Sequence, residues 1–292
     1  MSVPGPDFFI IGAQKCGTSW LHQQLRRHEN VYMPADKDPP LHLLDQTDCQ
    51  RLKDRQNSGD EDQLRGDCNA AYLWTTSSMQ VDEDLTETPP HHFNPDIVEL
   101  FHACMGSNMK IIVLLRDPVQ RAVSAYLHHI AMRSLQASTP IFQSPADLGI
   151  ISMGFYSVHL NNWLQKYSPE RILLLPSPEQ NNADQLLTET SRFLQITPFS
   201  HISKTVVFPG LRRHKDEHGV WVNLEHAAFQ QQYIPASIPC KLISGVNHAL
   251  LISCMDLQRL HVIYREELNR LHDLTSKIWP AVSLPFLAIG AR

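Results

Sequence analysis

The side chains best suited to chemistry lie in the segment 8–21, where a short apolar stretch runs into a turn and then into a predicted helix. Gly12 and Gly17 bound the turn and permit tight backbone conformations. Three side chains in or beside the turn can donate hydrogen bonds to an anion: Lys15, Thr18 and Ser19. Because the amino end of a helix carries partial positive charge and unpaired N–H groups, this segment predicts an anion-binding loop.

The spacing of the two glycines matches the first part of the phosphate-binding loop of ATP-binding proteins. That motif continues with a lysine and then a serine or threonine, whereas Thr18 and Ser19 follow Gly17 here. The lysine that would reach the β and γ phosphates of a triphosphate is missing, and Lys15 stands inside the loop instead. A nucleotide with a shorter anionic chain therefore fits better, although an ordinary strand-to-helix turn can show the same glycine spacing.

A second anion-binding element is predicted at 110–126. Its apolar residues 111–115 indicate a buried strand, Arg116 follows directly, and Pro118 is typical of a helix start. Ligands of open α/β sheets bind beyond the carboxyl ends of the strands, so Arg116 should lie at the same edge as the first loop. Arg116 and Ser124 can then bind one phosphate. The alternative is an arginine paired at a strand end and a serine that packs on the helix.

Together the two elements resemble the sulfotransferase family that uses 3′-phosphoadenosine 5′-phosphosulfate (PAPS). The matching residues are Lys15-Cys16-Gly17-Thr18-Ser19-Trp20-Leu21 and Arg116-Asp117-Pro118, followed by Arg121 and Ser124-Ala125-Tyr126. The resemblance implies that the first loop holds the 5′-phosphosulfate and that its lysine assists the bridging oxygen as it leaves. It also implies that the arginine and the serine of the second element hold the 3′-phosphate. The cofactor-binding residues carried over from these two elements are Lys15, Cys16, Gly17, Thr18, Ser19, Trp20, Arg116 and Ser124.

Further segments resemble the carbohydrate-type and bacterial branches of this family, in the same order along the chain. They are Tyr32-Met33-Pro34 with Lys37-Asp38-Pro39, Gly66-Asp67 with Tyr72, Gly154-Phe155-Tyr156, Arg171 to Leu175, and the predicted helix from about Asp256 to His272. The resemblance adds Tyr156 to the cofactor-binding residues. It also places a basic segment that closes over the nucleotide at 201–248, where we expect Arg212 and Arg213 to do so; an exposed basic turn is the alternative.

The resemblance further implies a catalytic base, because the acceptor must lose a proton. In the carbohydrate branch the base is the glutamate of a Lys-Glu-Pro segment, and Asp38 stands at that position here. Aspartate is one methylene shorter than glutamate and more acidic. His42 is the second candidate base, since a cytosolic branch of the superfamily uses a histidine. With 16 histidines in the chain, His42 also fits an ordinary surface residue.

The alternation of apolar strands and helices predicts one α/β domain over 1–292, with a central parallel sheet flanked by helices. The resemblance implies the sulfotransferase version of the P-loop NTPase-like fold, with substrate or lid insertions at about 45–95 and 201–248. The expected strands are 7–12, 110–115 and 171–176, and the expected helices are 18–28, 95–104, 118–135, 154–167, 181–194 and about 256–272. The polar stretch 45–68 is expected to be a connection, with a short element near 70–75.

The composition and the first residues of the chain indicate which binding partners, location and cysteine state to expect. Its 292 residues carry a net charge of −5, which gives no general attraction to nucleic acid or to an anionic membrane. The first residues lack the long apolar run of a signal peptide or a membrane anchor, so we expect a cytoplasmic protein. The six cysteines show no Cys-x-x-Cys spacing, and we expect reduced thiols. For Cys16, the helix start and Lys15 favour a lowered pKa.

These observations predict a sulfotransferase that moves the sulfuryl group of PAPS to a hydroxyl or amine of a small metabolite or carbohydrate by direct in-line transfer. By this hypothesis 3′-phosphoadenosine 5′-phosphate (PAP) is the product nucleotide and no metal is required. Two alternatives stay open: a P-loop-like kinase or NTPase, and a non-catalytic nucleotide-binding relative. The kinase alternative needs a lysine before the loop hydroxyl and an acidic magnesium ligand after a second strand, yet that strand ends in Arg116.

Overall fold

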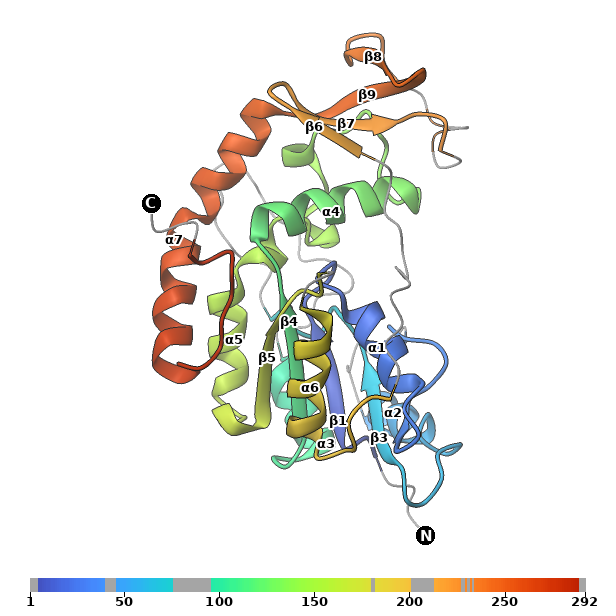
Figure 1. Ribbon diagram of the computed structural model, residues 1–292, viewed down its shortest axis with the longest axis vertical. Coiled ribbons are helices and arrows are strands. Elements are labelled where there is room, and N and C mark those ends of the chain that lie inside the picture. Colours follow the sequence, from blue (N-terminus) through green and yellow to red (C-terminus); the bar gives the residue numbers. More distant parts are fainter. Residues whose placement is uncertain are drawn as a thin grey trace.

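Residues 5–39, 46–75, 96–179, 182–200, 213–226, 229, 232 and 234–288 are the part of the chain described by the computed structural model. Within these ranges the chain forms two sheets and a set of helices around them (Figure 1). The predicted sites at His42 and Arg212 lie outside the described residues.

The parallel sheet has the strand order β2-β3-β1-β4-β5. The strands are Phe8–Gly12 (β1), Val31–Tyr32 (β2), Leu64–Cys68 (β3), Lys110–Leu115 (β4) and Ile172–Pro176 (β5). All of β1 is buried, as is β4 after its first residue, because both faces of the sheet are covered. The predicted α/β class with a central parallel sheet is therefore confirmed, and the three strands expected from apolar runs are β1, β4 and β5.

Helices cover the parallel sheet and extend beyond it (Figure 1). They are Thr18–Arg26 (α1), Gln46–Asp54 (α2), Ile97–Met105 (α3), Pro118–Ala131 (α4), Tyr156–Leu164 (α5), Ala183–Leu194 (α6) and Cys254–Ile278 (α7). Short 3-10 turns occur at Ile141–Gln143, Ala146–Leu148, Ser152–Gly154 and Pro169–Arg171. α4 lies across the upper end of the parallel sheet, so its residues face the carboxyl ends of β1 and β4 (Figure 1).

The expected connection at 45–68 is wrong in two places, since α2 and β3 lie there. β3 has the sequence Leu-Arg-Gly-Asp-Cys, which contains two charged residues and so lacks the apolar run of a buried strand. Asp67 is nevertheless fully buried in it, because its carboxylate accepts a hydrogen bond of 2.7 Å from Arg55 Nε. The hydrophobic pattern of a sequence does not reveal a strand whose buried charged side chain is neutralised by a residue of another segment.

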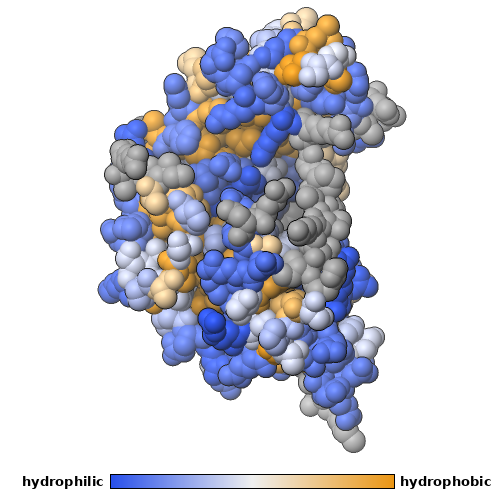
Figure 2. Space-filling model, viewed as in Figure 1, coloured by the Kyte–Doolittle hydropathy of each residue, from blue (hydrophilic) through white to orange (hydrophobic). Residues whose placement is uncertain are grey.

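A second sheet was not predicted. Its strands Arg213–Asp216 (β6), Gly219–Asn223 (β7), Cys240–Ile243 (β8) and Val246–Ser253 (β9) pair antiparallel in the order β6-β7-β9-β8. They begin within the segment 201–248, which was expected to be a basic loop, and β9 extends beyond it. β7 and β9 bury apolar residues against α4 and α7, and β6 exposes polar ones. Figure 2 shows mainly hydrophilic side chains on this face, with apolar ones at its upper end, where this sheet lies.

The expectation of reduced thiols is wrong for two of the six cysteines. Cys49 of α2 and Cys104 of α3 form a disulfide, with their Cα atoms 5.6 Å apart. The two residues are 55 positions apart in the sequence, and only the packing of α2 against α3 brings them together. Cys16, Cys68, Cys240 and Cys254 are free.

Candidate functional site

The loop 13–17 between β1 and α1 has the backbone shape of an anion-binding turn. Gly17 is the N-cap of α1 with φ 96° and ψ 10°, and Lys15 has φ 66°. Few residues other than glycine adopt such left-handed conformations, and strain of this kind is concentrated at functional sites. A Cβ at Gly17 would stand 2.2 Å from Cδ of Pro178, so a side chain there would displace the turn after β5.

Donors at the start of α1 are left free for a ligand. No side chain caps the helix, and the first amides bonded to the Gly17 carbonyl are those of Trp20 and Leu21, at 3.0 and 3.1 Å. The N–H groups of Thr18 and Ser19 precede these bonds and have no partner within the helix. This is the arrangement in which helix amino ends bind phosphate and sulfate.

The sheet register brings the second element to the first. Gly12 pairs with Val113, and the Ala13 amide donates to the Leu114 carbonyl at 2.8 Å, so the loop begins where β4 ends. Arg116 follows β4 at this edge, and its guanidinium donates to Oε1 of Gln120 at 3.0 and 3.3 Å. Since Gln120 is a neutral partner, the Arg116 charge is not neutralised by that contact.

Two cations of the site, Lys15 and Arg213, lie within electrostatic range of other cations: Lys37 and Arg116 act on Lys15, and Arg116 acts on Arg213. Burial, and then the charges of Lys37 and Arg116, lower the pKa of Lys15. Partial burial and the charge of Arg116 lower the pKa of Arg213. Neighbouring positive charges that lower the pKa of a partly buried lysine or arginine are typical of a site that binds an anionic ligand. The structure thus brings together Lys15, Arg116 and Arg213 of the predicted donor site and adds Lys37.

Asp38, the first candidate base, is held at the same edge of the sheet. It has φ 53°, and its amide donates to the Cys68 carbonyl at 2.8 Å. Its Oδ1 accepts from the Ala70 amide at 2.8 Å, and its Oδ2 forms an ion pair with Lys37. The carboxyl side chain is 41% exposed, so solvent or a substrate can reach it.

Arg55 fixes the backbone next to Asp38, a role that sequence reasoning missed. It donates to both carboxylate oxygens of Asp67, at 2.7 and 3.2 Å, and to the Asp36 carbonyl at 2.7 Å. From α1, Nε2 of His22 lies 3.0 Å from the Pro34 carbonyl, and burial lowers the pKa of His22 to about 4, so its neutral ring donates there. The segment that carries Lys37 and Asp38 is therefore tied to the scaffold on two sides.

α4 presents one open stripe to this site. The helix is mostly buried, whereas Gln120, Ser124 and His128, four residues apart, are exposed or partly exposed. Burial, then the charges of Lys15, His129 and Lys37, lower the pKa of His128 to about 4, and the charge of Asp38 opposes this. His128 is thus a neutral side chain among the charged groups of the site, and sequence reasoning missed it. The sequence signal that could have identified His128 is its spacing from Ser124, because four residues place it one helical turn further along the same face.

Cys16 and Tyr156 support the loop from behind. Both side chains are fully buried, and Sγ of Cys16 lies 3.7 Å from the Tyr156 hydroxyl. Burial raises the pKa of the Cys16 thiol, so the expected lowering is wrong: desolvation outweighs the nearby charges of Arg121 and Arg116. Cofactor contacts of these two residues stay predictions, as do those of Trp20.

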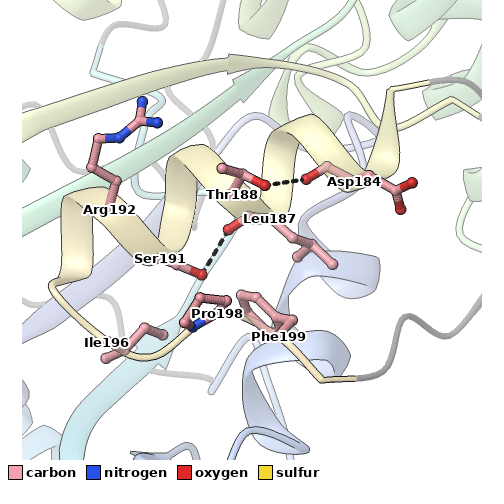
Figure 3. A pocket seen from close by; sticks show the side chains of 8 residues that line it. All are labelled: Asp184, Leu187, Thr188, Ser191, Arg192, Ile196, Pro198 and Phe199. Carbon is pink, nitrogen blue, oxygen red and sulfur yellow. Dashed lines mark hydrogen bonds between the residues drawn. The ribbon is translucent and has the colours of Figure 1, made fainter.

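A separate pocket of about 310 Å³ lies between α6 and the segment 196–199 (Figure 3). Its lining residues are Asp184, Leu187, Thr188, Ser191, Arg192, Ile196, Pro198 and Phe199. The hydroxyls of Thr188 and Ser191 are bonded to carbonyls of their own helix, at 2.8 and 2.9 Å. The lining includes none of the residues that form the anion-binding loop or the end of β4, so this pocket is not the predicted site.

The sequence model of the sulfotransferase domain family matches residues 5–218, which contain both of the predicted anion-binding elements. The chain belongs to this family. Among similar proteins, carbohydrate sulfotransferase 15 of Mus musculus is 24% identical over 253 residues, covering 67% of this chain and 44% of that protein. The bifunctional heparan sulfate N-deacetylase/N-sulfotransferase 2 of Homo sapiens is 25% identical over 231 residues, covering 74% of this chain and 24% of that protein. This sulfotransferase chain thus spans less than half the length of the curated relatives it matches.

The fold of this sulfotransferase chain also resembles a solved structure. The crystal structure of a sulfotransferase from Alicyclobacillus acidocaldarius superposes with a TM-score of 0.54 at 20% identity, over 71% of this chain and 88% of that one. Within the described ranges, no helix is long and apolar enough to cross a membrane. In the same ranges, His, Cys, Asp and Glu side chains form no cluster of three that is able to hold a metal ion.

Proposed function

We propose that this chain transfers the sulfuryl group of PAPS to a hydroxyl or amine of a carbohydrate or small metabolite. The observation that carries the proposal is that Lys15 and Arg116, which follow β1 and β4 at the carboxyl edge of the parallel sheet, lie within electrostatic range of each other, with Lys37 acting on Lys15 and Arg213 of β6 in range of Arg116. The free amides at the start of α1 add neutral donors beside these charges. A donor with a phosphosulfate at one end and a phosphate at the other supplies the anions for both elements.

Each element takes one part of this proposed site. The loop amides and Lys15 bind the phosphosulfate end, and Lys15 stabilises negative charge on the leaving oxygen. Arg116 and Ser124 bind the second phosphate, and Arg213 of β6 adds its charge on the side of Arg116. PAPS supplies the activated sulfuryl group when it is bound. A kinase or NTPase is disfavoured, because Arg116, and not an acidic magnesium ligand, directly follows β4.

The acceptor class rests on the names of relatives. Carbohydrate sulfotransferase 15 and the heparan sulfate N-sulfotransferases are named for carbohydrate acceptors, one group with transfer to nitrogen. We therefore propose a carbohydrate hydroxyl or amine before other small metabolites. We also propose that Asp38 accepts the acceptor's proton. Its Oδ1 is anchored by an amide, and its Oδ2 becomes free when Lys37 turns to the anionic donor.

Replacing Arg116 with alanine is expected to weaken PAP binding about 30-fold, since a charge-assisted phosphate contact is lost. Calorimetric titration with PAP, compared with ATP and magnesium, measures this on the wild type and the variant. Arg51→Ala is the control, because Arg51 is a 63% exposed side chain of α2 that pairs only locally with Asp48. Tighter binding of magnesium-ATP than of PAP, or equal PAP affinity in both proteins, would contradict the proposed donor site.

Replacing Asp38 with asparagine is expected to lower kcat about 100-fold, as removal of a positioned base does, with little change in PAP affinity. Asparagine keeps the oxygen that accepts from the Ala70 amide, so the loop geometry is retained. Transfer of radiolabelled sulfate to a panel of sugars and amines gives the rate. Asp54→Asn, on the exposed face of α2, is the matched control. A variant as active as the control would remove Asp38 from the base role.

A further inference from the structure

The segment 149–157 runs behind the anion-binding loop and is held by α7. The Tyr264 hydroxyl donates to the Ile151 carbonyl at 2.7 Å. One turn further along α7, Glu267 accepts two hydrogen bonds from Ser157, one from its amide at 2.6 Å and one from its hydroxyl at 2.7 Å. The helix therefore binds both ends of a short stretch that is more than 100 residues away in sequence.

Close packing accompanies these bonds. A Cβ at Gly154 would lie 2.6 Å from the Tyr264 hydroxyl, so glycine is needed for α7 to approach the backbone. The rings of Phe155 and Tyr264 stand 5.3 Å apart between centroids. This surface of α7 touches the segment continuously and leaves it little freedom to shift.

α4 holds the same segment from another side. Arg121 is fully buried and donates to the Gly149 carbonyl at 3.3 Å and to the Ile150 carbonyl. The same helix carries Ser124 of the proposed phosphate site. Carbonyls 149 to 151 are thus bound by side chains of two helices, and the amide of Ser157 by a third side chain.

Tyr156 connects the segment 149–157 to the anion-binding loop. It begins α5 next to Ser157, its side chain is fully buried, and its hydroxyl touches Cys16, which stands between Lys15 and Gly17. A shift of α5 would move Tyr156 and with it the back of the loop. The left-handed conformation of Lys15, which is unfavourable for a residue with a Cβ, requires such support from the surrounding structure.

Glu267 is the charged member of this arrangement, and the proposed reaction does not use it directly. Its side chain is fully buried, and its nearest cation is Nε of Arg270 at 3.9 Å, on a side chain that is 54% exposed. The carboxylate lies at the amino end of α5, where helix polarity favours negative charge. Burying a carboxylate is costly unless its oxygens are bonded, and the two bonds from Ser157 satisfy that need.

We propose that Glu267 is a positioning residue for the anion-binding loop: through Ser157 and Tyr156 it fixes Cys16, and so sets where Lys15 stands. The family match ends at residue 218, and α7 begins at Cys254. The support that Glu267 gives to the loop therefore comes from outside the matched residues. The consequence for sulfuryl transfer rests on the proposed function. The consequence for the loop itself does not.

Alkylation of Cys16 with iodoacetamide, followed by peptide mass analysis, tests the support without any donor. In Glu267→Ala we expect the Cys16 rate to rise about tenfold and PAP affinity to fall about fivefold, effects typical of residues that act through a packed network. Cys68, a second fully buried thiol, reports global loosening and should not change. Glu266→Gln is the control on an 82% exposed neighbour, and Glu267→Gln, which keeps the size and one acceptor, should restore most of the wild-type behaviour.

An unchanged Cys16 rate in Glu267→Ala, or equal increases at Cys16 and Cys68, would overturn the inference, since the residue would then be irrelevant to the loop or merely structural. If Glu267→Ala does not fold, Ser157→Ala removes the hydroxyl bond alone, and the same comparison of the two thiols decides the question. Failure of the wild type to bind PAP would count against the proposed function only. The labelling result would still decide whether Glu267 holds the loop.

Discussion

Replacing Lys15 with alanine is expected to lower kcat about 1,000-fold, because one preorganised donor to a leaving oxygen contributes about 4 kcal/mol to the transition state. Lys15 stands in a left-handed turn, and burial together with the charges of Lys37 and Arg116 lowers its pKa. The lowered pKa also sets a direction for pH: donor affinity should decline as the pH rises through it, because deprotonation removes the charge. Sulfate transfer and PAP titration across the alkaline range measure the two effects.

The control for this variant is Lys166→Ala, which removes a surface lysine paired with Glu99 at 2.8 Å. It should leave kcat and PAP affinity unchanged. A Lys15→Ala protein that transfers sulfate at nearly the control rate would contradict the role given to the loop. Tight PAP binding by the wild type without transfer to any acceptor in a broad panel would instead favour the non-catalytic alternative.

Local motifs in the sequence predicted the two anion-binding elements, because each is a strand, a turn and a helix that follow directly along the chain. Gly12, Gly17 and Arg116 owe their positions to the ends of β1 and β4, and β1, like β4 after Lys110, is an unbroken run without a polar side chain. The parallel register then places the elements together, since Gly12 pairs with Val113. Because β1 and β4 are neighbours in the parallel sheet, the two predicted elements meet at one edge of it.

Other parts of the site depend on contacts between distant residues and so left no periodic signal. Arg55 contacts Asp36, beside the candidate base, and Asp67, whose burial in β3 hid that strand from prediction. Arg213 acts on Arg116 because β6 belongs to a sheet that packs on α4 and α7. Glu267 contacts Ser157 across 110 positions. In each case the partner is chosen by tertiary packing, which a single sequence does not encode as a local pattern.

Removing the disulfide between Cys49 and Cys104 is expected to lower the free energy of unfolding by about 4 kcal/mol, because the bond closes a long loop of the unfolded chain. For a chain of this size that loss corresponds to a fall in melting temperature on the order of 8 °C. The double variant Cys49→Ser/Cys104→Ser, compared with the wild type by thermal and urea unfolding under non-reducing conditions, measures it. Dithiothreitol should lower the stability of the wild type to that of the variant.

The matched control is Cys240→Ser, which changes an exposed free thiol of β8 and should leave stability unaltered. Thiol counting in denaturant without reductant should find four reactive cysteines in the wild type, those that the structure shows as free. Six reactive thiols, or equal melting temperatures for wild type and double variant, would contradict the bond. Because the disulfide ties α2 to α3, while Arg55 just after α2 holds the backbone beside Asp38, loss of the disulfide should also lower kcat for sulfuryl transfer modestly. That result would connect a distant covalent restraint to the position of the proposed base.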